Sequence, residues 1–217
     1  MLFIVATPIG NLEDITLRAL RVLREADLII AEDTRHTGLL LKHFEIPHKP
    51  MISLYKEVEI DKINDILASA KELKVVLVSD AGTPLISDPG YKLVREALTQ
   101  NLPIESVPGP NAAITALTLS GLPPDKFLFL GYPPEKESHT RQVLEKYQNL
   151  NATIIFYVSP HKLLRFLGLL KEDQEIVIAR ELTKIHQEIW RGKPSEALVK
   201  FSKPQGEFVV LWNAKLS

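Results

Sequence analysis

The chain has 217 residues, of which 45% are hydrophobic and 24% are charged, and its formal net charge of −1 is that of an ordinary globular protein with one large or two modest domains. It has no cysteine, which excludes disulfides, thiolate nucleophiles and cysteine-ligated zinc. No apolar run approaches the roughly 20 residues of a membrane helix, so we expect a cytoplasmic protein that makes no contact with a membrane.

The first 110 residues alternate short β-branched runs with longer segments of helical period. Strands are predicted at residues 2–6, 28–31, 51–54, 75–79 and 104–107. Apolar residues at helical spacing follow at 17–23, 60–70 and 93–98. This alternation predicts an α/β domain with a mostly parallel sheet.

An apolar helix is predicted at residues 112–119. It is followed by Gly121 and the pair Pro123-Pro124, which no helix can pass through, so we expect the domain boundary after residue 120. The second domain, 121–217, is predicted to have strands at 127–130, 153–158, 175–180, 185–190 and 208–212 and helices at 138–148 and 161–170. The alternating run 185–190 is typical of a half-exposed strand and favours antiparallel pairing, so the second sheet is expected to be mixed.

Small and polar residues follow four predicted strands of the first domain. They are the runs TPIGN at 7–11, EDTRHT at 32–37, SDAGTP at 79–84 and PGPN at 108–111. Ligands of open α/β sheets bind outside the carboxyl ends of the strands, and a glycine such as Gly82 lets the backbone approach a ligand closely. The sequence therefore predicts a ligand-binding edge on the first sheet.

Several common sites are absent from the sequence. The chain has no G-x-G-x-x-G after its first strand and no G-x-x-x-x-G-K-[ST] loop, which argues against NAD and ATP. It has no H-E-x-x-H and no G-x-S-x-G, which argues against a zinc protease and an α/β-hydrolase. His36, His43 and His48 lack the spacing of metal ligands, so no metal site is expected.

Six motifs occur in order: TPIGN at 7–11, AEDTRHT at 31–37, SDAGTPLISDPG at 79–90, PGPNAAITAL at 108–117, FYVSPHK at 156–162 and ARELTK at 179–184. With this set the chain closely resembles the ribosomal RNA small-subunit methyltransferase I family. That family belongs to the tetrapyrrole-methylase superfamily and uses S-adenosylmethionine to methylate the ribose 2′-oxygen of a cytidine in the decoding region of 16S rRNA. Val158 stands where family members commonly have an acidic residue.

The resemblance implies two α/β domains of the class III methyltransferase type, with the cofactor in the cleft between them. It also implies a homodimer that acts on 16S rRNA or on the small ribosomal subunit. Carried over residue by residue, the S-adenosylmethionine contacts would be Pro8, Ile9, Gly10, Asp80, Ala81, Gly82, Thr83, Asn111, Ala112, Ala113, Phe156 and Tyr157. Two plainer interpretations remain open, a simple turn at 8–10 and ordinary helix packing at 112–113.

Methyl transfer to a ribose hydroxyl requires alignment of the reactants and removal of the hydroxyl proton. We expect Arg35 to bind a substrate phosphate or the developing alkoxide, with Asp33 or His36 polarising the hydroxyl. A structural alternative is open. Asp33 could cap a helix that begins near Thr34, with Glu32 and Arg35 paired on its first turn.

The second half of the chain is the basic half. Residues 1–125 carry 12 Lys/Arg and 17 Asp/Glu, whereas residues 126–217 carry 14 and 10. RNA contacts are predicted at Lys136, Arg141, Lys162, Arg165, Arg180 and Lys184, with Tyr132 available for stacking. Arg180 could instead form a structural pair with Glu181 or another acid. Two other functions remain open: methylation of a small tetrapyrrole-like molecule by the same fold, and a catalytically silent RNA-binding factor.

Overall fold

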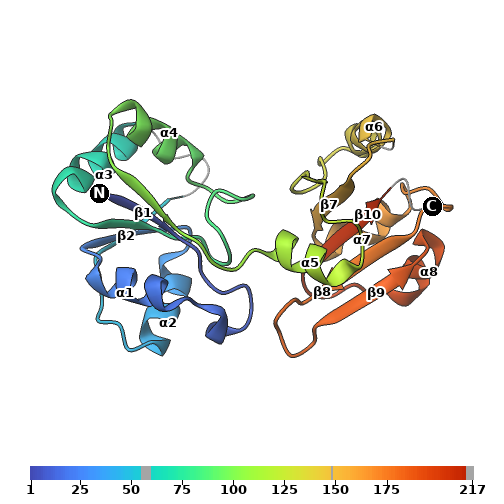
Figure 1. Cartoon of the computed structure of the whole chain (residues 1–217), viewed down its shortest axis with the longest axis horizontal. Helices are drawn as coiled ribbons and strands as arrows, with labels where there is room; N and C mark the ends of the chain where they lie inside the picture. Colours follow the sequence, from blue (N-terminus) through green and yellow to red (C-terminus); the bar gives the residue numbers. More distant parts are fainter. Residues whose placement is uncertain (55–59, 148, 214–217) are drawn as a thin grey trace. The chain divides into compact units, whose positions relative to one another are not determined.

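The computed structural model describes residues 1–54, 60–147 and 149–213, and the chain forms two compact units, Met1–Asn111 and Ala112–Ser217 (Figure 1). The division lies one helix before the boundary expected after residue 120. The reason is that helix α5, Ala112–Ser120, packs against β7, β8 and β10 of the second unit. The expected helix at 112–119 is thus present, but it belongs to the second sheet.

The first unit contains a parallel sheet whose strands were all predicted. They are β1 (Leu2–Val5), β2 (Leu28–Ala31), β3 (Met51–Ser53), β4 (Val75–Leu77) and β5 (Ile104–Val107). Their order is β3-β2-β4-β1-β5, and each adjacent pair is parallel. The chain moves outward from β1 to β3 and returns through β4 to β5, so its direction across the sheet reverses at β3. β1 lies between β4 and β5, and ligands of doubly wound sheets bind outside the carboxyl ends of such strands.

Helices cover both faces of the first sheet (Figure 1). They are α1 (Leu17–Glu25) and α2 (Thr34–His43) on one face, and α3 (Ile60–Glu72) and α4 (Tyr91–Thr99) on the other; a short 3₁₀ helix, η1, spans Leu12–Asp14. Successive strand residues point to opposite faces: Leu28 packs with the α3 and α4 side chains, whereas Ile29 packs with those of α1 and α2. Because both faces are buried, polar loops are confined to the sheet edges.

The second unit contains a mixed sheet, as expected. Its strands are β6 (Phe127–Phe129), β7 (Thr153–Val158), β8 (Ile176–Arg180), β9 (Glu188–Gly192) and β10 (Phe208–Asn213). Their order is β6-β7-β10-β8-β9; β6 and β7 are parallel, and the other neighbours are antiparallel. The strand expected at 185–190 begins only at Glu188.

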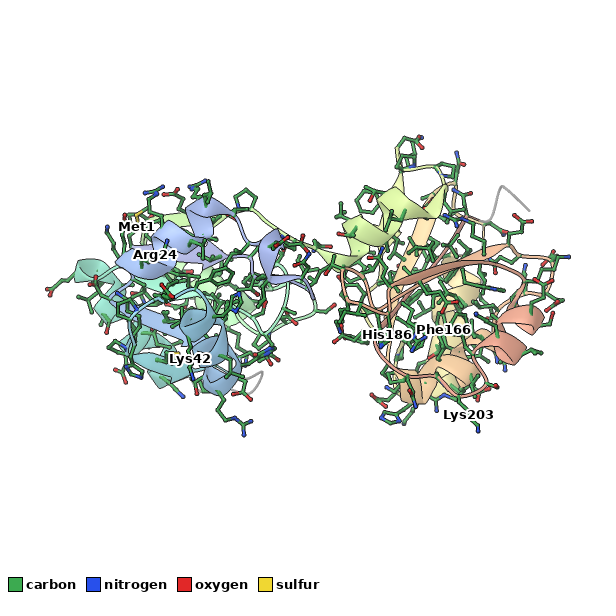
Figure 2. All side chains as sticks on the ribbon, turned by 90° about the horizontal axis from the view of Figure 1, so that it is seen from below. Met1, Arg24, Lys42, Phe166, His186 and Lys203 are labelled. Atoms are coloured by element: carbon green, nitrogen blue, oxygen red, sulfur yellow. The ribbon has the colours of Figure 1, made fainter. Side chains whose placement is uncertain are left out.

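Helices α6 (Glu137–Tyr147), α7 (Pro160–Leu167) and α8 (Pro194–Lys200) complete the second unit. Position 148, the expected end of the first of these, lies outside the described residues. The core contains an aromatic cluster: Phe156 stacks on Trp212 with ring centroids 5.7 Å apart, and Phe166 packs against both. Phe166 is labelled among the side chains of this unit in Figure 2. In the described parts of the chain, no helix has the length and apolar character to cross a membrane.

Candidate functional site

The loops that follow β1 and β4 lie side by side and are joined through their backbones. The Thr7 N–H donates to the Gly82 carbonyl at 2.9 Å, and the Gly82 N–H donates back to the Thr7 carbonyl at 3.0 Å. The Thr7 hydroxyl also donates to the Ser79 carbonyl at 3.3 Å, and both side chains are buried. The structure therefore brings together the predicted cofactor runs 7–11 and 79–84.

Gly82 and Thr83 connect these two loops to the loop that follows β5. Gly82 has φ +80°, and a Cβ at this position would lie 3.2 Å from Ile9 Cγ2 and 3.6 Å from the Pro110 carbonyl oxygen. The Thr83 hydroxyl donates to that same carbonyl at 3.0 Å. Three strand ends thus form one assembly, and only glycine fits at its centre without strain.

The predicted cofactor residues of this assembly have two different roles. Pro8 and Ile9 are buried and support the loop after β1, whereas Gly10 and Ala81 are exposed. An exposed rim of residues with little or no side chain leaves backbone groups accessible to a polar ligand. This arrangement fits a cofactor that is bound mainly through the backbone.

The loop between β4 and α4 contains further residues in the left-handed region, and no sequence pattern singled them out. Leu85 has φ +74° and Ser87 has φ +71°, in addition to Gly82 and Gly90. Each non-glycine residue in such a conformation costs roughly 1–3 kcal/mol and persists because the surrounding structure holds it. The loop SDAGTPLISDPG is therefore tightly constrained over its length.

Asp14 is a second residue that sequence reasoning missed. It ends the short helix η1 directly after the run 7–11. Its Oδ2 atom is buried and has no hydrogen-bond partner among the described residues. Buried carboxylate oxygens are rarely left without a donor, so this atom offers an acceptor beside the candidate cofactor loop.

Asp33 acts as the N-cap of α2, which is the structural alternative considered from the sequence. Its Oδ1 accepts the Arg35 backbone N–H at 2.8 Å, and its two oxygens accept the Arg35 Nε and Nη2 groups at 3.1 and 2.6 Å. The first-turn pair expected between Glu32 and Arg35 is thus formed by Asp33 instead. The reason is that the capping carboxylate already lies over the first turn of the helix.

The pairing with Arg35 changes the titration of Asp33. Hydrogen bonds from the Arg35 side chain, followed by the Arg35 backbone N–H, hold the pKa of the Asp33 carboxyl far below its usual range. The same pairing raises the pKa of Arg35. A carboxylate with so low a pKa is a weak general base near neutral pH. Asp33 is therefore better suited to hold Arg35 than to accept a proton.

His36 and Asp80 meet at the same edge. The His36 Nδ1 lies 3.9 Å from Asp80 Oδ2, and Asp80 Oδ1 accepts the Asp33 backbone N–H at 3.0 Å. Asp80 therefore connects the loop after β4 to the start of α2, and it lies beside the imidazole. The His36 side chain is 58% exposed, so its other ring nitrogen can be reached by a substrate.

The predicted cofactor residues of the second unit are only partly suited to ligand contact. Ala113, at the start of α5, donates its backbone N–H to the Tyr157 hydroxyl at 3.1 Å, so these two positions are together. Phe156 has its side chain in the core with 1% exposed, so only its backbone could touch a ligand. Asn111 is the last residue of the first unit, and Ala112 is the first residue of the second.

Val158 also lies in that core, with 1% of its surface exposed. An acidic side chain at this place would need a buried partner, whereas valine packs directly against its apolar neighbours. The departure from the family pattern is therefore accommodated by the core.

The predicted RNA-binding residues after β6 and β7 gather around one acid. Lys162 forms an ion pair with the Glu135 carboxylate, and Arg165 Nη2 donates to the Glu135 carbonyl at 2.9 Å. Lys136 is exposed beside them. Arg141, one turn into α6, pairs with Glu137 at 3.0 Å in an exposed i,i+4 contact, which contributes little to stability.

The other two predicted RNA contacts hold the loop between β8 and β9. Arg180 pairs with Glu188 at 3.6 Å and donates to the Gln205 carbonyl at 2.7 Å. The Lys184 ammonium donates to Glu181 at 3.0 Å and to Glu207 at 2.9 Å. Arg180 thus forms a structural pair, as the alternative interpretation proposed, but its partner is not Glu181.

Burial and hydrogen bonding shift the pKa values of Glu181 and Lys184 in opposite directions. Burial would raise the pKa of Glu181, but hydrogen bonds from the Glu207 N–H and from Lys184 lower it overall. Burial would lower the pKa of Lys184, but hydrogen bonds to Glu207 and Glu181 raise it overall. Both groups are therefore held in their charged forms.

Among the described residues, no group of three or more His, Cys, Asp or Glu side chains is placed to hold a metal ion.

Comparisons with known proteins agree with the two-unit architecture. The family model described as Tetrapyrrole (Corrin/Porphyrin) Methylases matches residues 1–198. The chain is 48% identical to the ribosomal RNA small subunit methyltransferase I of Thermotoga maritima, covering 99% of this chain and 98% of that protein. It is 46% identical to the protein of the same name from Escherichia coli O157:H7, covering 97% of this chain and 76% of that protein.

Solved structures of similar fold are more distant in sequence. A diphthine synthase matches with a TM-score of 0.77 at 17% identity, covering 99% of this chain and 89% of that chain. The methyltransferase CobJ matches with a TM-score of 0.71 at 19% identity, covering 98% and 93%. At such identities the likeness concerns the fold alone.

Proposed function

The chain belongs to the ribosomal RNA small subunit methyltransferase I family of the tetrapyrrole methylases, and on this premise we propose that it methylates the ribose 2′-oxygen of a cytidine in the decoding region of 16S rRNA. The observation that carries the proposal is the assembly of loops after β1, β4 and β5, with His36 and Asp80 beside it. The relatives' name supports ribosomal RNA as the substrate class, whereas the neighbours of similar fold share too little sequence to support a tetrapyrrole substrate.

The cofactor of this proposal is S-adenosylmethionine. When bound, it supplies an electrophilic methyl group on a sulfonium, so the chain need only bind, orient and deprotonate the reactants. Gly10 and Ala81 are exposed and have little or no side chain, and only glycine fits without strain at position 82. These features fit a ligand that is held through backbone groups. We include Asn111, the last residue of the first unit, and Ala113 and Tyr157 of the second unit as further cofactor contacts.

In this proposal His36 is the group that accepts the proton of the ribose hydroxyl. Its Nδ1 faces Asp80, so the carboxylate can orient the ring and stabilise the imidazolium that forms. Arg35 is held by Asp33 and keeps its positive charge, which suits a phosphate of the RNA or the developing alkoxide. Asp33 is the positioning residue for Arg35, and His36 takes the role of the base.

RNA is proposed to approach along the basic side of the second unit, where Lys136 is exposed and Arg141 is held only by a surface pair. Phosphate contacts there would set affinity and register without choosing the nucleotide. We expect unpaired RNA as the substrate, because a single strand can turn a ribose 2′-oxygen toward a loop edge more freely than a duplex can. We further propose that the protein works as a homodimer in the cytoplasm, where ribosomes are found.

The proposal is tested by methyl transfer from labelled S-adenosylmethionine to small ribosomal subunits and to free 16S rRNA, both from a strain that lacks this protein. The expected product is a single 2′-O-methylcytidine in the decoding region, mapped by mass spectrometry of nuclease fragments. Methylation of a base, or of a site elsewhere in the rRNA, would correct the specificity. No transfer to either substrate, with cofactor binding intact, would overturn the proposed function.

A further inference from the structure

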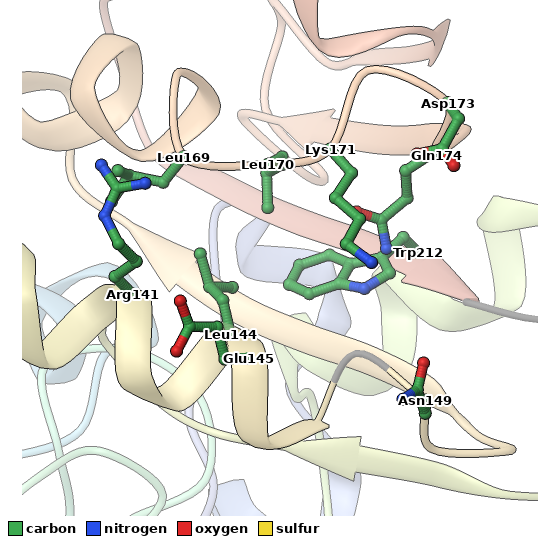
Figure 3. Close-up of a pocket in the computed structure, with 10 residues that line it drawn as sticks. All are labelled: Arg141, Leu144, Glu145, Asn149, Leu169, Leu170, Lys171, Asp173, Gln174 and Trp212. Carbon is green, nitrogen blue, oxygen red and sulfur yellow. The ribbon is translucent and has the colours of Figure 1, made fainter.

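A cavity of about 360 Å³ lies in the second unit between α6 and the turn that follows α7 (Figure 3). Trp212 of β10 forms its floor, Arg141 and Leu144 line it from α6, and Leu170 and Lys171 line it from the turn. Trp212 pairs with Ile154 and Ile176 at the starts of β7 and β8. The cavity is therefore at the sheet edge opposite to the ion pairs of Glu135 and Glu181.

The cavity combines apolar walls with polar side chains. Leu144, Leu170 and Trp212 supply the apolar surface, and Trp212 is fixed from below by its stacking on Phe156. Gln174 is 8% exposed and Trp212 is 3% exposed, and both residues line the cavity. The amide of Gln174 and the indole N–H of Trp212 are groups that can form hydrogen bonds with the polar edge of a ligand.

Two cations stand at the opening. Arg141 leaves α6 beside Leu169, and Lys171 reaches over Trp212 from the turn (Figure 3). Arg141 is 55% exposed, and its pair with Glu137 is a weak i,i+4 surface contact, which a phosphate could replace. The acids Glu145 and Asp173 also line the cavity, so it is not a simple anion site.

We propose that this cavity takes one unpaired nucleotide of the RNA substrate. The base lies between Leu144, Leu170 and the edge of Trp212, with its polar edge toward Gln174, and its phosphate lies near Arg141 and Lys171. Proteins that read unpaired RNA combine such walls, amides and cations, and the volume is within the range of small-molecule pockets. The inference rests on the proposed function, because it assigns a second contact to the same RNA.

The path to the cavity supports RNA as the occupant. Helix α6 begins at Glu137, directly after Lys136 and Glu135, which belong to the basic edge that follows β6. Arg141 lies one turn further along the helix, and Leu144 and Glu145 lie one turn beyond that. An RNA strand bound at Lys136 can therefore follow α6 to the cavity.

The test uses the whole protein and unmethylated small ribosomal subunits. The double variant Arg141→Glu with Lys171→Glu changes two exposed side chains. We expect the KM for subunits to rise about tenfold or more and the salt slope of binding to fall by about two, with the affinity for S-adenosylmethionine retained. The matched control is Lys146→Glu with Lys193→Glu, which makes the same charge change outside the cavity and should alter KM less than about twofold.

Ultraviolet crosslinking to the subunits supplies a readout that does not depend on turnover. We expect an RNA nucleotide on a peptide containing residues 169–174 or 141–145, and loss of that crosslink in Gln174→Ala. Equal KM values for the charge variant and its control, a crosslink that avoids both peptides, or a crosslink to a ribosomal protein would each overturn the inference. A wild-type protein that crosslinks here but transfers no methyl group would instead refute the proposed function alone.

Discussion

The carboxyl edges of the two sheets are built in different ways. On the first sheet, backbone hydrogen bonds at Gly82 join the loops after β1 and β4, and the Thr83 hydroxyl joins them to the loop after β5. The exposed residues there, Gly10 and Ala81, have little or no side chain. On the second sheet, the loops after β6, β7 and β8 are held by ion pairs to Glu135, Glu181, Glu188 and Glu207.

The difference shows what each edge is suited to do. Backbone groups close to an open rim can surround a small polar molecule, because no side chain stands in the way. At the second edge, ion pairs hold the loops in place. Each paired cation must separate from its carboxylate before it can bind a phosphate. The first edge is therefore the candidate for cofactor and chemistry, and much of the second edge has a structural role.

The largest effect is expected at His36, where the first edge is proposed to do chemistry. His36→Ala should lower kcat about a hundredfold or more, because a general base contributes roughly 10²–10⁴-fold. S-adenosylmethionine affinity should stay the same, since the imidazole faces Asp80 and not the joined backbones. His43→Ala, at the other end of α2, is the control and should retain full activity. A kcat for His36→Ala within about threefold of wild type would remove His36 from the mechanism.

The next effect tests the backbone construction of the first edge. Gly82→Ala should weaken S-adenosylmethionine binding about tenfold or more, because its Cβ would press on Ile9. Gly121→Ala is a matched control: Gly121 has φ +77°, close to the +80° of Gly82, but a Cβ there meets nothing within 4 Å. Both variants should lose about 1–2 kcal/mol of stability from the left-handed backbone. Calorimetric titration that finds equal affinities in the two variants would contradict the account.

A smaller effect separates structural cations from RNA-binding cations on the second edge. Lys184→Ala should lower the free energy of unfolding by about 1 kcal/mol, because Glu181 and Glu207 lose their shared partner. Lys136→Ala should leave stability unchanged and weaken RNA binding in a salt-dependent way. Urea unfolding and filter binding of rRNA measure the two quantities. The opposite pattern would return Lys184 to the RNA-binding surface.

The smallest effect is the pH dependence of the Glu181 and Lys184 cluster. The pKa of Glu181 is below its ordinary 4.5, so its contribution to stability is complete above pH 4.5 and is lost as the pH falls through the lowered pKa. The pKa of Lys184 is above its ordinary 10.5, so its contribution is complete below pH 10.5 and is lost as the pH rises through the raised pKa. The stability difference between wild type and Glu181→Gln should therefore be constant between these values and shrink in acid. A stability difference that grew as the pH fell below 4.5 would contradict this expectation.

The sequence predicted the strands of the first unit because each is a short apolar run bounded by turn residues. It could not predict which face of β7 carries a given side chain. Five of the six β7 residues are buried, since α5 covers one face and the aromatic core the other, so no alternation showed that Phe156 points away from Tyr157. The sequence therefore did not show that the Phe156 side chain lies in the core, and the cofactor contact expected at Phe156 stays a prediction.

Counting charges along the sequence also could not predict ion pairs whose partners are far apart in the sequence. Lys184 and Glu207 are 23 residues apart, and Lys162 and Glu135 are 27 apart, so only the folded sheet brings them together. Helix α8 was missed because Lys193 precedes it, where Ser, Thr, Asp or Asn would signal an N-cap. The strand expected at 185–190 begins late because Glu181 and Thr183 adopt positive φ and turn the chain first.

We propose that S-adenosylmethionine binds at the carboxyl edge of the first sheet. Backbone hydrogen–deuterium exchange of the wild-type protein with and without the cofactor tests this directly. We expect slower exchange in peptides that span Thr7–Asn11 and Ser79–Thr83, with no change in peptides that span 181–187. Protection confined to the second edge, or binding without protection at either loop of the first, would contradict it.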